Sequence, residues 1–199
     1  MADELQINRF AVLGISGGGP YAAACAFKMP DRLAATGIVC GMGPSDAPGM
    51  VDGASWTVPG KPSILRRLVL MLTAMGLQRD PDQFLSRSKE TFSATDRQLL
   101  DQPELARALI EGLQEAFRPG MGGAYQDAAL YAQPWGFRLQ DISARVHLWH
   151  GGQDNNVPVS VGQYVAEAIP GCNASFCDGE GHLTLPRNRI REILSTLVS

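Results

Sequence analysis

The chain has 199 residues, of which 45% are hydrophobic and 19% are charged, and its formal net charge is −3. This length and composition indicate one globular domain with a buried core. The negative charge argues against a nucleic-acid partner, and no apolar run reaches the ~20 residues of a membrane span, so we expect neither nucleic acid nor membrane as a partner.

The start of the chain predicts a strand, a tight turn, a helix and a second strand. Residues 10–14 (FAVLG) form a continuous apolar run, which is typical of a strand buried on both faces. The Ala-rich segment at 21–28 favours a helix, with Pro20 acceptable in its first turn. Residues 35–40 (ATGIVC) predict another buried strand. This order is a βαβ unit, which implies a parallel sheet.

The middle of the chain predicts helices and no strand. Residues 41–60 are rich in Gly, Pro and Asp, as in a loop. Helical patterns follow at residues 62–76, 81–88, 96–100, 103–117 and 123–132. The first pattern carries an apolar stripe at helical spacing, formed by Ile64, Leu65, Leu68, Val69, Leu72 and Met75. We expect an all-helical insertion over residues 44–144, in which the stripe serves packing first and a pocket wall second.

Strand and helix signals alternate again towards the C-terminus. The predicted elements are strands at 145–149 and 174–176 and helices at 159–168 and 187–198. Together with the first 43 residues, residues 145–199 therefore predict an α/β core. We expect a mostly parallel sheet with helices on both faces.

One motif with chemical meaning lies between the first predicted strand and helix. Gly14-Ile15-Ser16-Gly17-Gly18 matches G-x-S-x-G. Such a turn holds a nucleophile in a strained backbone above the sheet, and we expect glycines two positions before and after Ser16 to avoid clashes. The amide of Gly17 is a candidate oxyanion donor. Ser16 is therefore a candidate nucleophile, and a purely structural turn is the alternative.

A serine nucleophile needs a base and a group that orients the base. Asp154 follows the predicted strand at 145–149, and His182 lies in a loop after the last strand. The chain order is then Ser16, Asp154, His182.

Other histidines and carboxylates fit these roles less well. His147 lies inside a predicted strand and His150 at its end, where packing or a turn explains them more simply. Asp178 and Glu180 share the loop of His182 itself, so we favour Asp154 as the acid.

Three motifs in this order, FAVLGISGGGPYAAACA, LWHGGQDNNVPV and GEGHLTLP, resemble the α/β-hydrolase superfamily, in the branch of hydrolases and acyltransferases with a helical lid. The resemblance covers nearly the whole chain and implies a partial α/β-hydrolase fold with its lid at 44–144. It implies that Ser16 is the nucleophile, His182 the general base and Asp154 its orienting partner. The implied reaction is acyl transfer to water through an acyl-serine intermediate.

We expect an esterase-like serine hydrolase that acts on a small-molecule substrate with an apolar acyl group. The residues expected to bind this substrate are Ile15, Leu68, Leu72 and Met75. The alternative function is a catalytically silent protein that binds a small apolar ligand or a protein partner under the lid.

A dinucleotide site is a weaker alternative. Residues 17–22 also fit G-x-G-x-x-A after a strand. That site requires an acidic residue at the end of the second strand, where residues 38–41 are Ile-Val-Cys-Gly. Pro20 also removes an amide that a pyrophosphate needs.

The family's second oxyanion donor comes from a loop after an earlier strand, and residues 1–13 contain no such loop. Loss of one donor costs ~10²–10³ in rate, so we expect weak hydrolysis. The strand at 10–14 is then expected at an edge of the sheet, which a second copy covers in a homodimer. The alternative is that the chain is a fragment of a longer enzyme.

The first residues and the cysteines bear on the cellular compartment. The first ten residues lack the basic, apolar and cleavage segments of a secretory signal. The cysteines, which are Cys25, Cys40, Cys172 and Cys177, show neither a CxxC pair nor the spacing of a metal site. We expect a cytoplasmic protein with reduced cysteines, no metal and no cofactor.

Overall fold

The computed structural model describes residues 1–50 and 63–199. Within these residues one parallel sheet has the order β1-β2-β3-β4. The strands are β1 (Phe10–Ile15), β2 (Leu33–Val39), β3 (Val146–Gly151) and β4 (Asn173–Cys177). The register places Ile15 beside Val39 and Val39 beside Trp149. The segments that follow β1, β2 and β3 therefore leave the sheet at the same edge. The predicted α/β class with a parallel sheet is confirmed.

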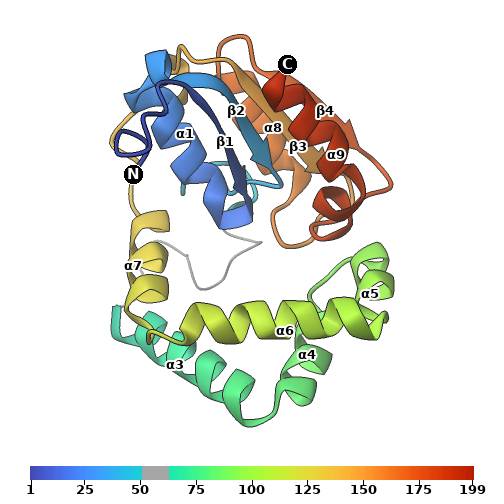
Figure 1. The fold of residues 1–199 in the computed structure, drawn as a ribbon. Coiled ribbons are helices and arrows are strands. Elements are labelled where there is room, and N and C mark those ends of the chain that lie inside the picture. The colour runs from blue at the N-terminus through green and yellow to red at the C-terminus, as the bar shows by residue number, and fades with distance from the viewer. Residues whose placement is uncertain (51–62) are drawn as a thin grey trace.

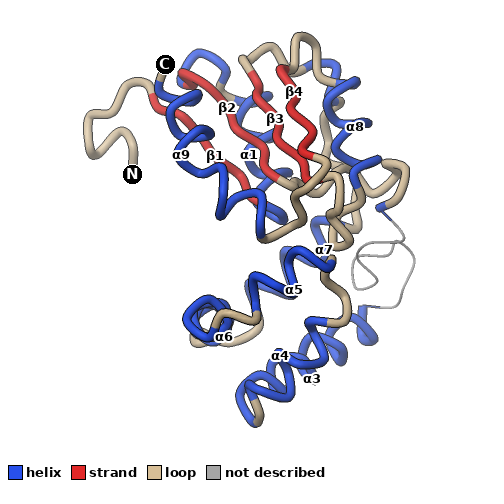
Figure 2. The backbone as a smooth tube through the Cα atoms, turned by 90° about the vertical axis from the view of Figure 1, so that its right-hand side faces the viewer, coloured by secondary structure: helices blue, strands red, loops and turns tan. Residues whose placement is uncertain are grey.

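Helices cover both faces of this sheet, as predicted (Figure 2). On one face lie α1 (Gly19–Lys28) and α8 (Val159–Ala168), whose Ala23 and Val165 belong to one buried cluster. On the other face lies α9 (Thr184–Val198), whose Ile193 packs with Val39 and Trp149. Small alanines on α1 let that helix approach the strands closely, which fixes the position of the turn that precedes it.

A block of helices connects β2 to β3. It contains α3 (Ser63–Arg79), α4 (Pro81–Lys89), α5 (Ala94–Leu100), α6 (Pro103–Phe117) and α7 (Gly122–Tyr131). These helices lie beyond the carboxyl ends of the strands, where α3 packs on α6 and α7, and α5 touches α9 (Figure 1). The prediction of a strandless middle is confirmed for residues 63–131. The loop predicted at 51–60 and the helix start predicted at Pro62 lie outside the described residues.

After α7 the chain returns along the α1 and α8 face. The ring of Phe137 stacks on Phe27 with centroids 4.8 Å apart, and Leu139 and Ile142 are buried in the same cluster as α1. The last part of the predicted insertion at 44–144 therefore packs with the core. The division of the chain into core and lid stays a prediction.

The edge position predicted for the first strand is confirmed within the described residues, because β1 pairs there with β2 alone. The prediction that this strand is buried on both faces is wrong: Ala11 is exposed, and Val12 and Leu13 are only half-buried. An edge strand lacks the neighbour that would cover it. The homodimer across this edge stays a prediction, which light scattering at micromolar protein concentration can check. Among the described helices, none has the length and apolar character for crossing a membrane.

Candidate active site

The nucleophile candidate lies in a short 3-10 turn, η1 (Ser16–Gly18), between β1 and α1. Ser16 has a φ of +53°, in the left-handed region that a residue with a side chain rarely adopts. Its carbonyl oxygen accepts a hydrogen bond from the amide of Met42 at 3.1 Å. The strained backbone predicted for this turn is thus present. The hydrogen bond from Met42, in the segment that follows β2, stabilises it.

The glycines around Ser16 differ in what they allow. A Cβ added to Gly14 would lie 2.2 Å from the carbonyl oxygen of Gly18 and 2.8 Å from the Cβ of Ala22, so a side chain cannot fit there. The clash predicted at Gly18 is wrong, because a Cβ at that position meets nothing within 4 Å. Gly19 is also crowded by backbone, since its Cβ would lie 2.8 Å from the Cα of Gly41.

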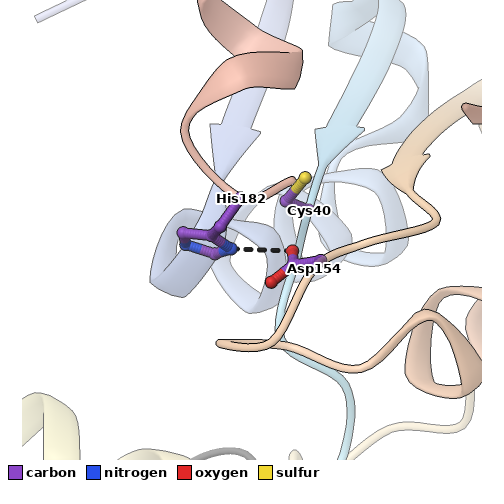
Figure 3. A group of neighbouring side chains, drawn as sticks. All are labelled: Cys40, Asp154 and His182. Atoms are coloured by element: carbon purple, nitrogen blue, oxygen red, sulfur yellow. Dashed lines mark hydrogen bonds and ion pairs between the residues drawn. The ribbon is translucent and has the colours of Figure 1, made fainter. Parts of the chain in front are cut away.

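A continuous chain of hydrogen bonds joins the three residues predicted as a triad. The Nε2 atom of His182 is 2.9 Å from the Oγ of Ser16, and its Nδ1 atom is 2.8 Å from an Oδ2 of Asp154. Figure 3 shows His182 directed at Asp154. Since the carboxylate can only accept, the proton is assigned to Nδ1, which leaves Nε2 free to accept the hydroxyl proton of Ser16. Asp154 and His182 are both buried.

The second oxygen of Asp154 holds the loop on which Asp154 lies. Its Oδ1 accepts the amides of Asn156 and Val157, each at 2.9 Å. This Asx-type turn leaves Oδ2 directed at His182. His150, at the end of β3, contacts the same loop. Its Nε2 atom lies 2.8 Å from the carbonyl oxygen of Val157 and 3.6 Å from Oδ2 of Asp154. Burial lowers the pKa of His150, so this ring is neutral beside the acid.

The competing groups have other partners in the structure. Glu180 accepts hydrogen bonds from the side-chain amide of Asn188 at 3.1 and 3.2 Å. His147 stacks on Trp149 and accepts a hydrogen bond from Arg145 at 2.9 Å. Packing therefore accounts for His147, and His150 holds the turn that carries Asp154; packing and a turn are the roles expected for these two histidines.

Cys40 lies beside Asp154 and His182 and is fully buried (Figure 3). Its Sγ, a ring nitrogen of His182 and a carboxylate oxygen of Asp154 lie within 4.8 Å of one another, which is close enough to share a metal ion. However, His182 and Asp154 already bind each other, and burial raises the pKa of the Cys40 thiol, which disfavours the thiolate that a metal needs. The donor set therefore suits a hydrogen-bonded triad better than a metal. All four cysteines are free thiols.

Gly17, the predicted oxyanion donor, is covered by α7. The hydroxyl of Tyr131 donates to the carbonyl oxygen of Gly17 at 2.8 Å, and a Cβ on Gly17 would lie 2.6 Å from that hydroxyl. Tyr131 thus fixes the peptide that follows Ser16, and the sequence carried no signal for it. A second unforeseen contact comes from α5, where Asp96 accepts the backbone amide of His182 at 2.8 Å.

The residues predicted to bind substrate are all partly exposed. The exposed fractions are 40% for Ile15, 45% for Leu68, 56% for Leu72 and 57% for Met75. Ile15 adjoins Ser16 at the end of β1. Leu72 lines a cavity of about 620 Å³ between α3 and α4, and Met75 lines another beside Phe117. Neither cavity contains a triad residue, so substrate contact by α3 stays a prediction.

No protein-family model and no curated protein matches the sequence. Solved structures match it over almost its full length. A bromoperoxidase from Bacillus anthracis is 19% identical with a TM-score of 0.69, covering 99% of this chain and 68% of that one. An esterase from Rhodococcus sp. ECU1013 is 21% identical with a TM-score of 0.66, covering 100% of this chain and 68% of that one. An alpha/beta hydrolase enzyme from a deep-sea metagenome library is 14% identical with a TM-score of 0.69, covering 100% and 68%.

The chain has the α/β-hydrolase fold. In an α/β-hydrolase fold the nucleophile follows a strand, and the acid and the histidine follow later strands in chain order. Ser16 after β1, Asp154 after β3 and His182 after β4 have this arrangement.

Proposed function

We propose that the protein is a serine hydrolase that cleaves a carboxylic ester with an apolar acyl group. The observation that carries this proposal is the unbroken hydrogen-bond chain from Ser16 through His182 to Asp154. Esterases are among the structurally similar proteins, which supports an ester as the substrate. Ile15, exposed beside the nucleophile, supports an apolar acyl group.

The proposed reaction has two halves. As Oγ of Ser16 bonds to the carbonyl carbon of the ester, Nε2 of His182 takes the hydroxyl proton. The carbonyl oxygen becomes an oxyanion, which the amide of Gly17 stabilises. The ester C–O bond then breaks, and the alcohol leaves with the proton from His182. Water, deprotonated by His182, attacks the acyl carbon, and the acid is released as Ser16 regains its proton.

Asp154 serves both halves without itself taking up a proton. It keeps the proton of His182 on Nδ1 and stabilises the imidazolium that forms. The amides of Asn156 and Val157, which both donate to its Oδ1, hold the carboxylate in place.

A fluorophosphonate probe tests the proposal, because it reacts only with an activated serine. The wild-type protein is expected to be labelled, and the label should be absent from Ser16→Ala. Ser160→Ala is the matched control, since Ser160 lies on α8 and its hydroxyl donates to the carbonyl of Pro48. If folded wild-type protein is not labelled, the hydrolase proposal fails and the silent, ligand-binding alternative takes its place. A series of p-nitrophenyl esters of increasing chain length then defines the acyl group.

A further inference from the structure

A buried carboxylate from the helical insertion contacts the loop that carries the base. Asp96, in the first turn of α5, is fully buried. Its carboxylate accepts three consecutive backbone amides, from His182 at 2.8 Å and from Leu183 and Thr184 at 2.9 Å each. These contacts join residues more than 80 positions apart in the chain.

The three amides lie at the N-terminal end of α9, where a helix leaves its first amides without partners of its own. No side chain within α9 caps this end. The carboxylate of Asp96 supplies the missing acceptors from a different element, and its negative charge lies at the positive end of the helix dipole. The amide of His182 is one of the three, so the same carboxylate also fixes the position of the backbone of His182.

The fit between the two segments is close. A Cβ on Gly181 would lie 2.3 Å from Oδ2 of Asp96 and 2.4 Å from the Oγ of Ser93. The amide of Gly181 is itself bound by Oγ1 of Thr184 at 2.6 Å. The loop that carries His182 is therefore packed between α5 and α9. Because residue 181 is a glycine, the side chains of Ser93 and Asp96 can lie against its backbone.

We propose that Asp96 is a positioning residue for His182, and this inference rests on the proposed hydrolase function. The ring of His182 must reach Ser16 and Asp154 at once, and both of its ring contacts are below 3 Å. The backbone amide of His182 is held by Asp96 alone among the side chains described. The helical insertion thus takes part in the chemistry by placing the base, besides its predicted part in binding substrate.

The test compares Asp96→Asn with Asp101→Asn. Asparagine keeps the shape of Asp96 but directs an NH₂ group at an amide that needs an acceptor. Asp101 is a matched control at the other end of α5, where its carboxylate pairs with Lys89 on the surface at 2.9 Å. With p-nitrophenyl acetate we expect Asp96→Asn to lower kcat by about 100-fold with KM within about twofold, because misplacing a reacting group by 1 Å costs about that much. Asp101→Asn should keep both constants.

A second measurement does not depend on catalysis. Hydrogen exchange should show the amides of residues 182–184 losing protection in Asp96→Asn and keeping it in Asp101→Asn. A wild-type kcat in folded Asp96→Asn, or a raised KM at unchanged kcat, overturns the inference. If Asp96→Asn does not fold, Gly181→Ala decides in the same assay: it pushes a methyl group into the carboxylate, and a wild-type kcat overturns the inference.

If wild-type Ser16 is not labelled by the fluorophosphonate, the proposed hydrolase function fails. Hydrogen exchange still tests whether Asp96 positions His182, and unchanged protection of residues 182–184 in Asp96→Asn would overturn that inference.

Discussion

The crowding around Ser16, the proposed nucleophile, makes Gly14→Ala the most informative single substitution. The new methyl group would lie 2.2 Å from the carbonyl oxygen of Gly18, 2.6 Å from its carbonyl carbon and 2.8 Å from the Cβ of Ala22. Two of these atoms are backbone, and the third is bonded directly to it, so none can rotate away. The turn or the helix must therefore move.

Overpacking of this kind costs about 1–3 kcal/mol, and we expect the upper end, about 3 kcal/mol, because the clash is with backbone. At this chain length each kcal/mol lowers the melting temperature by about 2–4 °C, so a fall of about 6–12 °C is expected. A shift of Ser16 by about 1 Å also slows its reaction about 100-fold.

The assays are urea unfolding and the rate of fluorophosphonate labelling. Gly18→Ala is the matched control, because a Cβ there meets nothing within 4 Å and its φ of −73° suits alanine. We expect it to change the free energy of unfolding by less than about 1 kcal/mol. Equal destabilisation by Gly14→Ala and Gly18→Ala would refute the reasoning, as would an unaffected Gly14→Ala.

Three further predictions follow from contacts of the triad. Asp154→Asn keeps the shape of the acid but permits the wrong tautomer of the base, so ester hydrolysis should fall by about 10⁴-fold, and a loss below tenfold contradicts the assignment. Tyr131→Phe removes the hydroxyl that donates to Gly17 and should lower the free energy of unfolding by about 1 kcal/mol in urea titrations, with slower labelling of Ser16. Because burial lowers the pKa of His150, the unfolded chain binds a proton below about pH 6.5 that the folded protein does not. The free energy of unfolding should therefore fall from pH 7 to pH 5.5, by up to about 1.4 kcal/mol per pH unit for this group, and the slope should flatten in His150→Gln.

The sequence predicts the bounds of a helix well where residues next to its ends determine them. The structure places α6 at Pro103–Phe117 and α8 at Val159–Ala168, as the sequence predicts. Pro103 is favourable in a first helical turn, and Pro170-Gly171 follows the end of α8. The hydrogen-bonded arrangement of Ser16, His182 and Asp154 is predictable for a similar reason, since Ser16 and Asp154 each follow a recognisable apolar strand.

Contacts between distant segments carry no local signal, and there the predictions fall short. The sequence predicts that the closing helix starts at residue 187, whereas α9 begins at Thr184. Its first turn is stabilised by Asp96, which no periodicity within α9 can reveal. The clash predicted at Gly14 is present, whereas the one predicted at Gly18 is replaced by crowding at Gly19, which depends on where Gly41 lies in space.

The sheet order β1-β2-β3-β4 also bears on how the chain folds. The outer pairs, β1 with β2 and β3 with β4, are each closed by a short connection through one helix. The central pair, β2 with β3, closes a loop of roughly 100 residues, and the entropy lost on closure grows with loop length. The two outer units are then expected to form first and the central pair last. Until that step, β2 and β3 each have one side without a partner strand. These open strand edges can pair with other chains, so the yield of refolded protein should fall at high protein concentration because of aggregation.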